Sequence, residues 1–180
     1  MEVRVSAPAL ERTLKTQLFT APGPSGKPER YFLNGNAATP CATYADDPHL
    51  SFKDDRIVVH LRTHSRFGTS VRGSCVGISL NTEAEVSFIP QAEGESIGFR
   101  DARIDHLSEN KELDFLLVPF LSHKLPAEMK VNAAVLMRTL LVHAPDSTGY
   151  TLTLSSLKIH SMLVEAQTLI VDLDANMRVD

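Results

Sequence analysis

Histidines are the first candidates for chemistry in this chain, because imidazole binds metals and transfers protons near neutral pH. The chain has seven of them, and His60 and His64 stand four positions apart. Both lie in a segment that alternates apolar and polar residues, which is typical of a β-strand. Four residues of strand span about 13 Å, too far for two ligands of one metal ion at about 2.0–2.1 Å each. We therefore expect a solvated polar sheet face and no metal site.

Paired carboxylates are the second candidates, since two of them can share general acid–base work. Glu83 with Glu85 and Asp172 with Asp174 each stand two positions apart on the polar side of a predicted strand. The carboxylates of each pair would lie about 7 Å apart. An exposed sheet face has no pocket that would shift their pKa values toward a catalytic range. These side chains are interpreted as solvating residues.

No nucleophile or phosphate-binding motif follows from the spacing. Ser74 and Cys75 come after Gly73, but residues 72–77 lack the Gly-x-Ser-x-Gly turn of a hydrolase and lead into a strand. The glycines of residues 22–27 do not have the spacing of a phosphate-binding loop. We therefore predict a protein with no catalytic residues and no cofactor.

Cys41 and Cys75 are the only cysteines, and no zinc or redox spacing includes them. They form either one structural disulfide, which would indicate an oxidising compartment, or two independent buried thiols. The chain between them is predicted to fold back on itself and could return Cys75 beside Cys41. That fold-back favours the disulfide.

Composition excludes several partners. The net charge is −4 and the Lys and Arg residues do not cluster, so we expect no nucleic-acid binding. No apolar run approaches the length of about 18 residues that spans a membrane. Charged residues throughout positions 1–20 argue against a signal peptide, and both a mature domain without its leader and a cytosolic protein fit this pattern.

The elements that would position these side chains are dominated by one long strand. Residues 75–90 alternate without interruption, which predicts a strand of about 50 Å with one apolar face. Residues 56–65 form the preceding strand, and residues 67–70 are predicted to turn the chain between the two. A shift in the alternation after Phe99 predicts a β-bulge at Arg100 and Asp101.

Helices are predicted where the apolar spacing changes to three and four. Residues 7–19 form an amphipathic helix with Ser6 as its N-cap, and Pro119 either kinks a second helix or starts its second half. A third helix places Ala133, Leu136, Met137, Leu140 and Leu141 on one face. Period two then returns in two strands, the last over residues 169–179.

Together these elements predict an α+β fold in which residues 1–180 form a single domain. A long, strongly curved antiparallel sheet wraps against the amphipathic helices. The side chains expected to point inward, and to contact an apolar ligand if there is one, are Val59, Leu61, Ile78, Leu80, Val86, Phe88, Phe99, Phe120, Val171 and Leu173. The chain has no Trp and only 6% aromatic residues, so either a packed core or a cavity fits.

This order of elements resembles the YceB-like family of small bacterial envelope lipoproteins, which have the architecture of tubular lipid-binding (TULIP-like) domains. The corresponding parts are a helix like Ala7–Phe19, a strand like Arg56–Ser65 that continues into the long strand, and the proline-containing segment Leu116–Leu121. The resemblance covers most of residues 3–142. Residues 150–179 depart from it.

The resemblance implies a periplasmic or envelope-associated domain that binds a lipid or fatty-acyl chain without catalysis. No cysteine for lipid attachment stands at the start of the sequence. The alternative is a structural module with a closed, ligand-free core, whose partner is another envelope protein.

Overall fold

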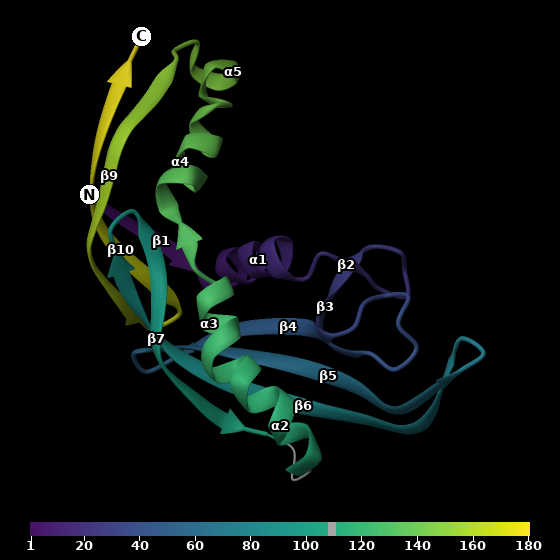
Figure 1. Cartoon of the computed structure of the whole chain (residues 1–180). Helices are drawn as coiled ribbons and strands as arrows, with labels where there is room; N and C mark the ends of the chain where they lie inside the picture. The colour runs from purple at the N-terminus through teal and green to yellow at the C-terminus, as the bar shows by residue number, and fades with distance from the viewer. Residues whose placement is uncertain (108–110) are drawn as a thin grey trace.

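The structure is a computed structural model, and it describes residues 1–107 and 111–180. Its fold is α+β, with two antiparallel sheets and helices packed against them (Figure 1). The elements run in the order β1 (Glu2–Ser6), α1 (Ala7–Leu18), β2 (Ala21–Pro22), β3 (Pro28–Asn34), β4 (Thr43–Lys53), β5 (Arg56–Val71), β6 (Ser74–Glu93), β7 (Ser96–His106), α2 (Lys111–Pro119), the π-helical turn η1 (Phe120–Lys124), α3 (Leu125–Glu128), β8 (Val131–Asn132), α4 (Ala133–Leu141), α5 (Ala144–Thr148), β9 (Leu152–Glu165) and β10 (Thr168–Val179).

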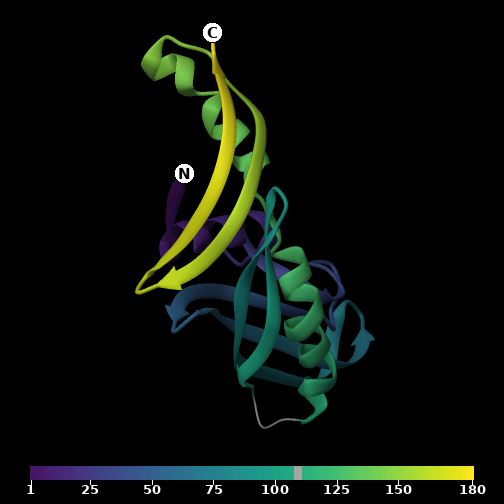
Figure 2. The same cartoon turned by 90° about the vertical axis from the view of Figure 1, so that its left-hand side faces the viewer.

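The larger sheet has seven strands in the order β2-β3-β4-β5-β6-β7-β8, and it curls into a half-barrel. Helix α1 packs against β4, while η1 and α3 pack against β7 (Figures 1 and 2). The strongly curved antiparallel sheet wrapped against helices is therefore confirmed. Helix α1 begins as predicted, because the Ser6 hydroxyl accepts a hydrogen bond from the Ala9 amide at 3.4 Å.

The long strand is confirmed and is longer than its alternation predicted. β6 has 20 residues, and its register with β5 is unbroken from Ile57 opposite Phe88 to Val71 opposite Ser74. The turn predicted at residues 67–70 is wrong, since the chain reverses two residues beyond Ser70, after β5 ends.

A pair of glycines explains why residues 67–70 read as a turn. Gly68 lies directly opposite Gly77, and a Cβ on Gly77 would stand 2.0 Å from the Phe67 carbonyl oxygen. The two backbones approach closely here because neither residue has a side chain. The hairpin continues past this point and bends toward its tip (Figure 1).

The predicted bulge in β7 is confirmed. The register of β6 and β7 shifts between Ser87 and Ile89, and Asp101 has a φ of 52°. The Arg56 guanidinium holds this bulge, since it forms an ion pair with the Asp101 carboxylate at 2.9 Å. Pro119 ends α2, and a π-helical turn follows it, so the predicted interruption of this helix is also confirmed.

The smaller sheet has the order β1-β10-β9, and α4 lies along β9. The far ends of β9 and β10, together with α4 and α5, form an arm that stands away from the half-barrel (Figure 2). Side chains of both sheets join one hydrophobic core. Among the described residues, no helix has the length and apolar character needed to cross a membrane.

Cys41 and Cys75 form a disulfide with an S–S distance of 2.08 Å and a Cα–Cα distance of 5.0 Å. The first of the two interpretations is therefore confirmed, and independent thiols are wrong. The bond ties the loop before β4 to the tip of the β5–β6 hairpin. Such bonds persist in oxidising compartments, so this one favours an extracellular or periplasmic location.

Candidate functional site

The inward-facing residues predicted from the sequence fall into three groups. Seven are buried, with at most 5% of their surface exposed: Val59, Leu61, Val86, Phe88, Phe120, Val171 and Leu173. Leu80 and Phe99 are half-buried at the margin of the core. Ile78 shares the face of these residues but is 61% exposed, so its predicted place in the interior is wrong. It lies beyond Leu80 toward the hairpin tip, where none of the described residues buries it.

The interior of the half-barrel is closely filled around these residues. Ile57 and Phe88 face each other across the hairpin, as do Val59 and Val86, and all four are fully buried. A void between α1 and the side chains of Phe99 and neighbouring residues measures about 10 Å³, close to the volume that one water needs. The contact of the predicted residues with a ligand stays a prediction, and larger openings lie elsewhere.

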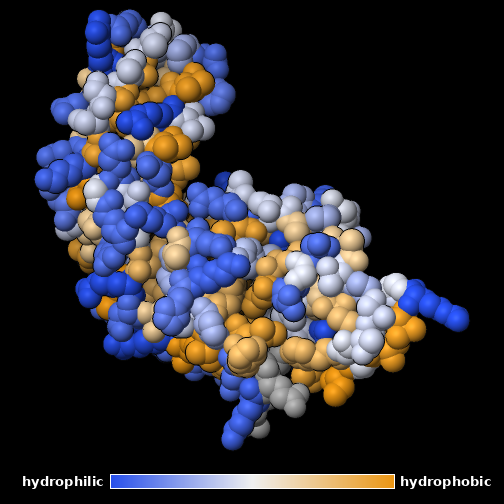
Figure 3. All heavy atoms as spheres, viewed as in Figure 1, coloured by the Kyte–Doolittle hydropathy of each residue, from blue (hydrophilic) through white to orange (hydrophobic). Residues whose placement is uncertain are grey.

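An apolar opening lies in the arm, between the helical segment α4–α5 and strand β9. This groove has a volume of about 350 Å³. Its walls come from Leu141, Val142 and Pro145 on the helical side, and its floor from the start of β9, including Leu152 and Leu154. In Figure 3 apolar surface follows α4 along the arm.

Local sequence explains how the groove is built. The Asn132 side chain accepts a hydrogen bond from the Val135 amide at 2.9 Å and begins α4. Gly149, with a φ of 75°, ends α5 and turns the chain into β9. Two backbone hydrogen bonds of 3.0 Å between Thr151 and Asp180 then fasten the ends of β9 and β10 together. The helices are thereby held over the first residues of β9.

Arg138 is the one charged residue that lines this groove. Its side chain is exposed, and it forms no ion pair with any residue in the described ranges. An apolar groove with a single unpaired cation at its edge matches an amphiphile that carries an apolar chain and an anionic head.

Helix α4 shows a face that the sequence interpretation missed. Ala134 is fully buried, and Met137 and Leu141 lie against the core beside it. Leu136 and Leu140, which were predicted to share the buried face, are 40% and 70% exposed. Because nearly every residue of this helix is apolar, its pattern could not select which side packs.

A second apolar surface continues the inner face of the β5–β6 hairpin toward its tip. It consists of Phe67, Val71, Val76, Ile78 and Leu80, and we call it the hairpin strip. Val76 and Ile78 are both 61% exposed, and Val71 is 47% exposed. The strip lines none of the openings found among the described residues, so it is an exposed surface rather than a pocket.

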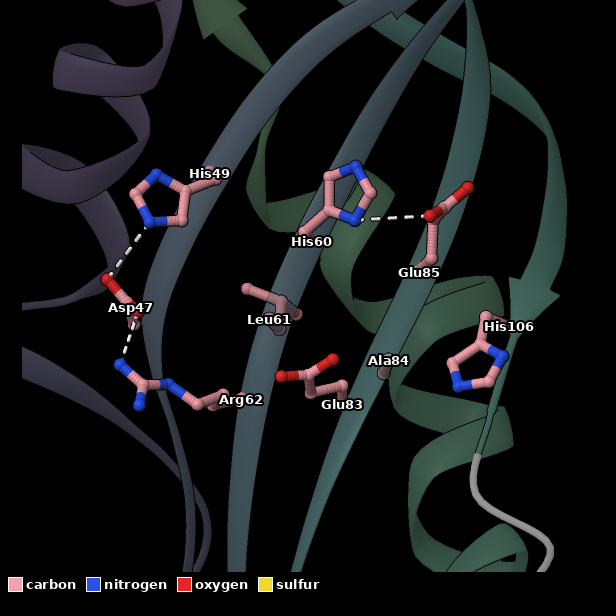
Figure 4. A pocket seen from close by; sticks show the side chains of 9 residues that line it. All are labelled: Asp47, His49, His60, Leu61, Arg62, Glu83, Ala84, Glu85 and His106. Atoms are coloured by element: carbon pink, nitrogen blue, oxygen red, sulfur yellow. Dashed lines mark hydrogen bonds and ion pairs between the residues drawn. The ribbon is translucent and has the colours of Figure 1, made fainter.

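A larger, polar opening lined by described residues lies on the opposite face of the same sheet (Figure 4). Its volume is about 420 Å³, and its lining is Asp47, His49, His60, Leu61, Arg62, Glu83, Ala84, Glu85 and His106. His60 Nδ1 lies 3.1 Å from Glu85 Oε2, and His49 Nε2 lies 3.2 Å from Asp47 Oδ1. Arg62 also forms an ion pair with Asp47.

These polar groups pair with one another across the sheet surface. The nine lining residues include no hydroxyl or thiol nucleophile. Within residues 1–107 and 111–180, no group of three His, Cys, Asp or Glu side chains is placed to hold a metal ion. The arrangement is that of a solvated face laced by ion pairs, as the histidine spacing predicted. His64 belongs to the same face and lies 3.1 Å from Asp46.

A carboxylate of α1 joins the edge of this face. Burial alone would raise the pKa of Glu11, but hydrogen bonds from the Lys15 ammonium and from the Leu50 amide outweigh it and lower that pKa. The Glu11 carboxylate therefore fastens α1 to β4 in its ionised form.

Comparison with known proteins identifies no relative: no family model, no curated protein and no solved structure matches the chain.

Proposed function

We propose that this protein binds, without catalysis, the acyl chain of an anionic amphiphile in the groove between α4–α5 and β9. The observation that carries the proposal is the groove itself, with apolar walls, about 350 Å³ of space and Arg138 at its edge. Small-molecule sites in proteins begin at about 300 Å³ and place a few polar groups in an apolar lining. The disulfide supports an oxidising compartment, and we propose the bacterial periplasm or envelope.

The location differs from the tunnel predicted under the half-barrel. That region is filled by Val86, Phe88 and their neighbours, whereas the groove lies between a different pair of helices and the second sheet. A lipid site between sheet and helices is thus retained, with other residues lining it.

The test uses palmitate as an anionic probe and a monoacylglycerol with the same acyl chain as a neutral probe. Titration calorimetry on the purified chain should show binding of both, with palmitate the tighter ligand. Val142→Trp fills the groove, and because Val142 is 71% exposed the substitution should not unfold the protein. We expect it to weaken both ligands by about tenfold or more, a loss of about 1.4 kcal/mol.

Two variants distinguish recognition of the ligand's acyl chain from recognition of its anionic head group. Arg138→Gln should weaken palmitate and leave the neutral lipid unchanged. Leu163→Trp is the matched control, since Leu163 is exposed on β9 but does not line the groove. Unchanged palmitate binding in Val142→Trp, or no binding by the unmodified chain, would show that the groove is not a lipid site.

The filled half-barrel core favours the alternative function, a structural module that binds another protein. Seven of the ten predicted ligand residues are buried among protein atoms. If neither lipid binds, this alternative becomes the leading one, and an envelope protein is the partner that it implies.

A further inference from the structure

Strand β6 has one edge that is open over half of its length. On one side β5 pairs with β6 from Phe88 down to Ser74. On the other side β7 pairs with it only from Glu85 onward. Between Ser74 and Ala84, no strand in the described ranges bonds to that edge. Eleven residues of strand span about 36 Å, and their outward N–H and C=O groups form a template for another strand.

This edge lacks the features that protect other sheet edges. Residues 74–82 contain no charged side chain, no proline and no register shift with β5. The open part of β10 offers a comparison, because it carries Asp174 and Arg178 and has register shifts with β9. Charges and bulges usually keep an exposed edge from pairing. Residues 74–82 of β6 have neither charges nor bulges and lie beside the exposed hairpin strip, so this edge is suited to pairing with another strand.

A second copy of the chain fits this edge. We infer that two copies pair antiparallel through their β6 edges, about a twofold axis near Ile78, and join the two half-barrels into one sheet. In this register Ile78 stands opposite Ile78 of the second copy, and Val76 stands opposite Leu80 of the second copy. Residues directly opposite share a face of the sheet, so the two hairpin strips become one apolar surface. A twofold pairing of this kind closes on itself and leaves no further edge of β6.

Charge complementarity supports the same partner. Arg72 at the hairpin turn and Glu83 on β6 are exposed, and neither forms an ion pair with any described residue. In this register Arg72 stands opposite Ala84 of the second copy, one residue from Glu83 of the second copy and within reach of its long side chain, and symmetry produces this approach twice. Between them, residues 73–82 carry no charge, so no like charges face each other across the axis.

The test is the mass of the intact, oxidised chain in solution, measured by analytical ultracentrifugation over a range of concentrations. We expect a reversible monomer–dimer equilibrium. Ile78→Lys places two like charges opposite each other and should raise the dimer dissociation constant by about tenfold or more. Because Ile78 is exposed in the monomer, the melting temperature of the Ile78→Lys monomer should equal that of the unmodified monomer. Leu140→Lys, which adds the same charge to an exposed residue of α4, is the matched control and should leave the dimer intact.

A charge exchange tests the register. Arg72→Glu and Glu83→Arg should each weaken the dimer, and the double variant should restore it. Hydrogen exchange of amides in residues 75–83 should slow at concentrations where the dimer forms. A chain that stays monomeric, or a dimer that Leu140→Lys dissociates and Ile78→Lys does not, would overturn the inference. The dimer does not depend on the proposed lipid site, and palmitate binding by the Ile78→Lys monomer tests that site separately.

Discussion

A pair of overpacking substitutions separates a packed half-barrel from a hollow one. Val86 is fully buried opposite Val59, and its neighbours Ile57 and Phe88 are also fully buried. Val86→Phe adds several carbon atoms at a position that has no exposed surface. Overpacking of this kind costs about 1–3 kcal/mol. Because Val86 and the residues around it are fully buried, we expect about 2–3 kcal/mol.

Urea unfolding measures this cost. With an m-value of about 1–3 kcal/mol/M, the midpoint should fall by roughly 1 M while the slope stays constant. Leu80→Phe is the control, because Leu80 is half-buried at the open end of the sheet and its ring can extend along the hairpin strip. It should change stability by less than about 0.5 kcal/mol. If Val86→Phe proves as stable as the unmodified chain, the half-barrel has room inside, and the reasoning from burial to a filled core is refuted.

Three further predictions follow from single contacts. Replacing Cys41 and Cys75 by serine should lower the free energy of unfolding by about 2–4 kcal/mol, because the disulfide joins residues with a sequence separation of 34. Reductant should lower the melting temperature of the unmodified chain as the substitutions do, and an unchanged melting temperature would contradict this prediction. Gly77→Ala would place a Cβ 2.0 Å from a β5 carbonyl oxygen and should cost about 1–3 kcal/mol in urea unfolding, whereas a neutral result would show that the hairpin can open there. Because the pKa of Glu11 is lowered in the folded state, its stabilisation is present above the usual Glu pKa of about 4.3 and is lost as the pH falls through the lowered value. The melting temperatures of the unmodified chain and Glu11→Gln should therefore converge in acid, and a difference that stays constant as the pH falls below about 4.3 would show that the ionised carboxylate is not responsible.

The alternation of apolar and polar residues, together with local helix capping, was enough to predict much of the fold. The alternation of residues 75–90 predicted β6, since side chains of a strand point to opposite faces in turn. Ser6 predicted the start of α1, because its hydroxyl can satisfy a free amide of the first turn. The phase change after Phe99 predicted the bulge that Asp101 occupies. Each of these depends on neighbours within a few residues, which a sequence displays directly.

Which residues of a sheet face are buried depends on tertiary packing. Alternation places Ile78 and Phe88 on the same side of β6, yet Phe88 is fully buried and Ile78 is 61% exposed, because the helices end before the hairpin does. The groove beside Arg138 was missed for a related reason. Helix α4 is apolar on several sides, so its sequence left more than one face that could pack.

The disulfide likewise depends on both local sequence and tertiary packing. The sequence shows that Cys41 and Cys75 are the only cysteines, and the predicted fold-back of the chain between them favoured a disulfide without establishing that the two meet. A 5.0 Å approach of their Cα atoms requires that the loop before β4 and the tip of a hairpin meet in space. No local pattern encodes such a meeting, because it depends on the length of β5, the position of its turn and the curl of the whole sheet. Strand periods and caps are thus properties of the sequence, whereas the groove, the open edge of β6 and the compartment that the disulfide favours come from how distant elements pack.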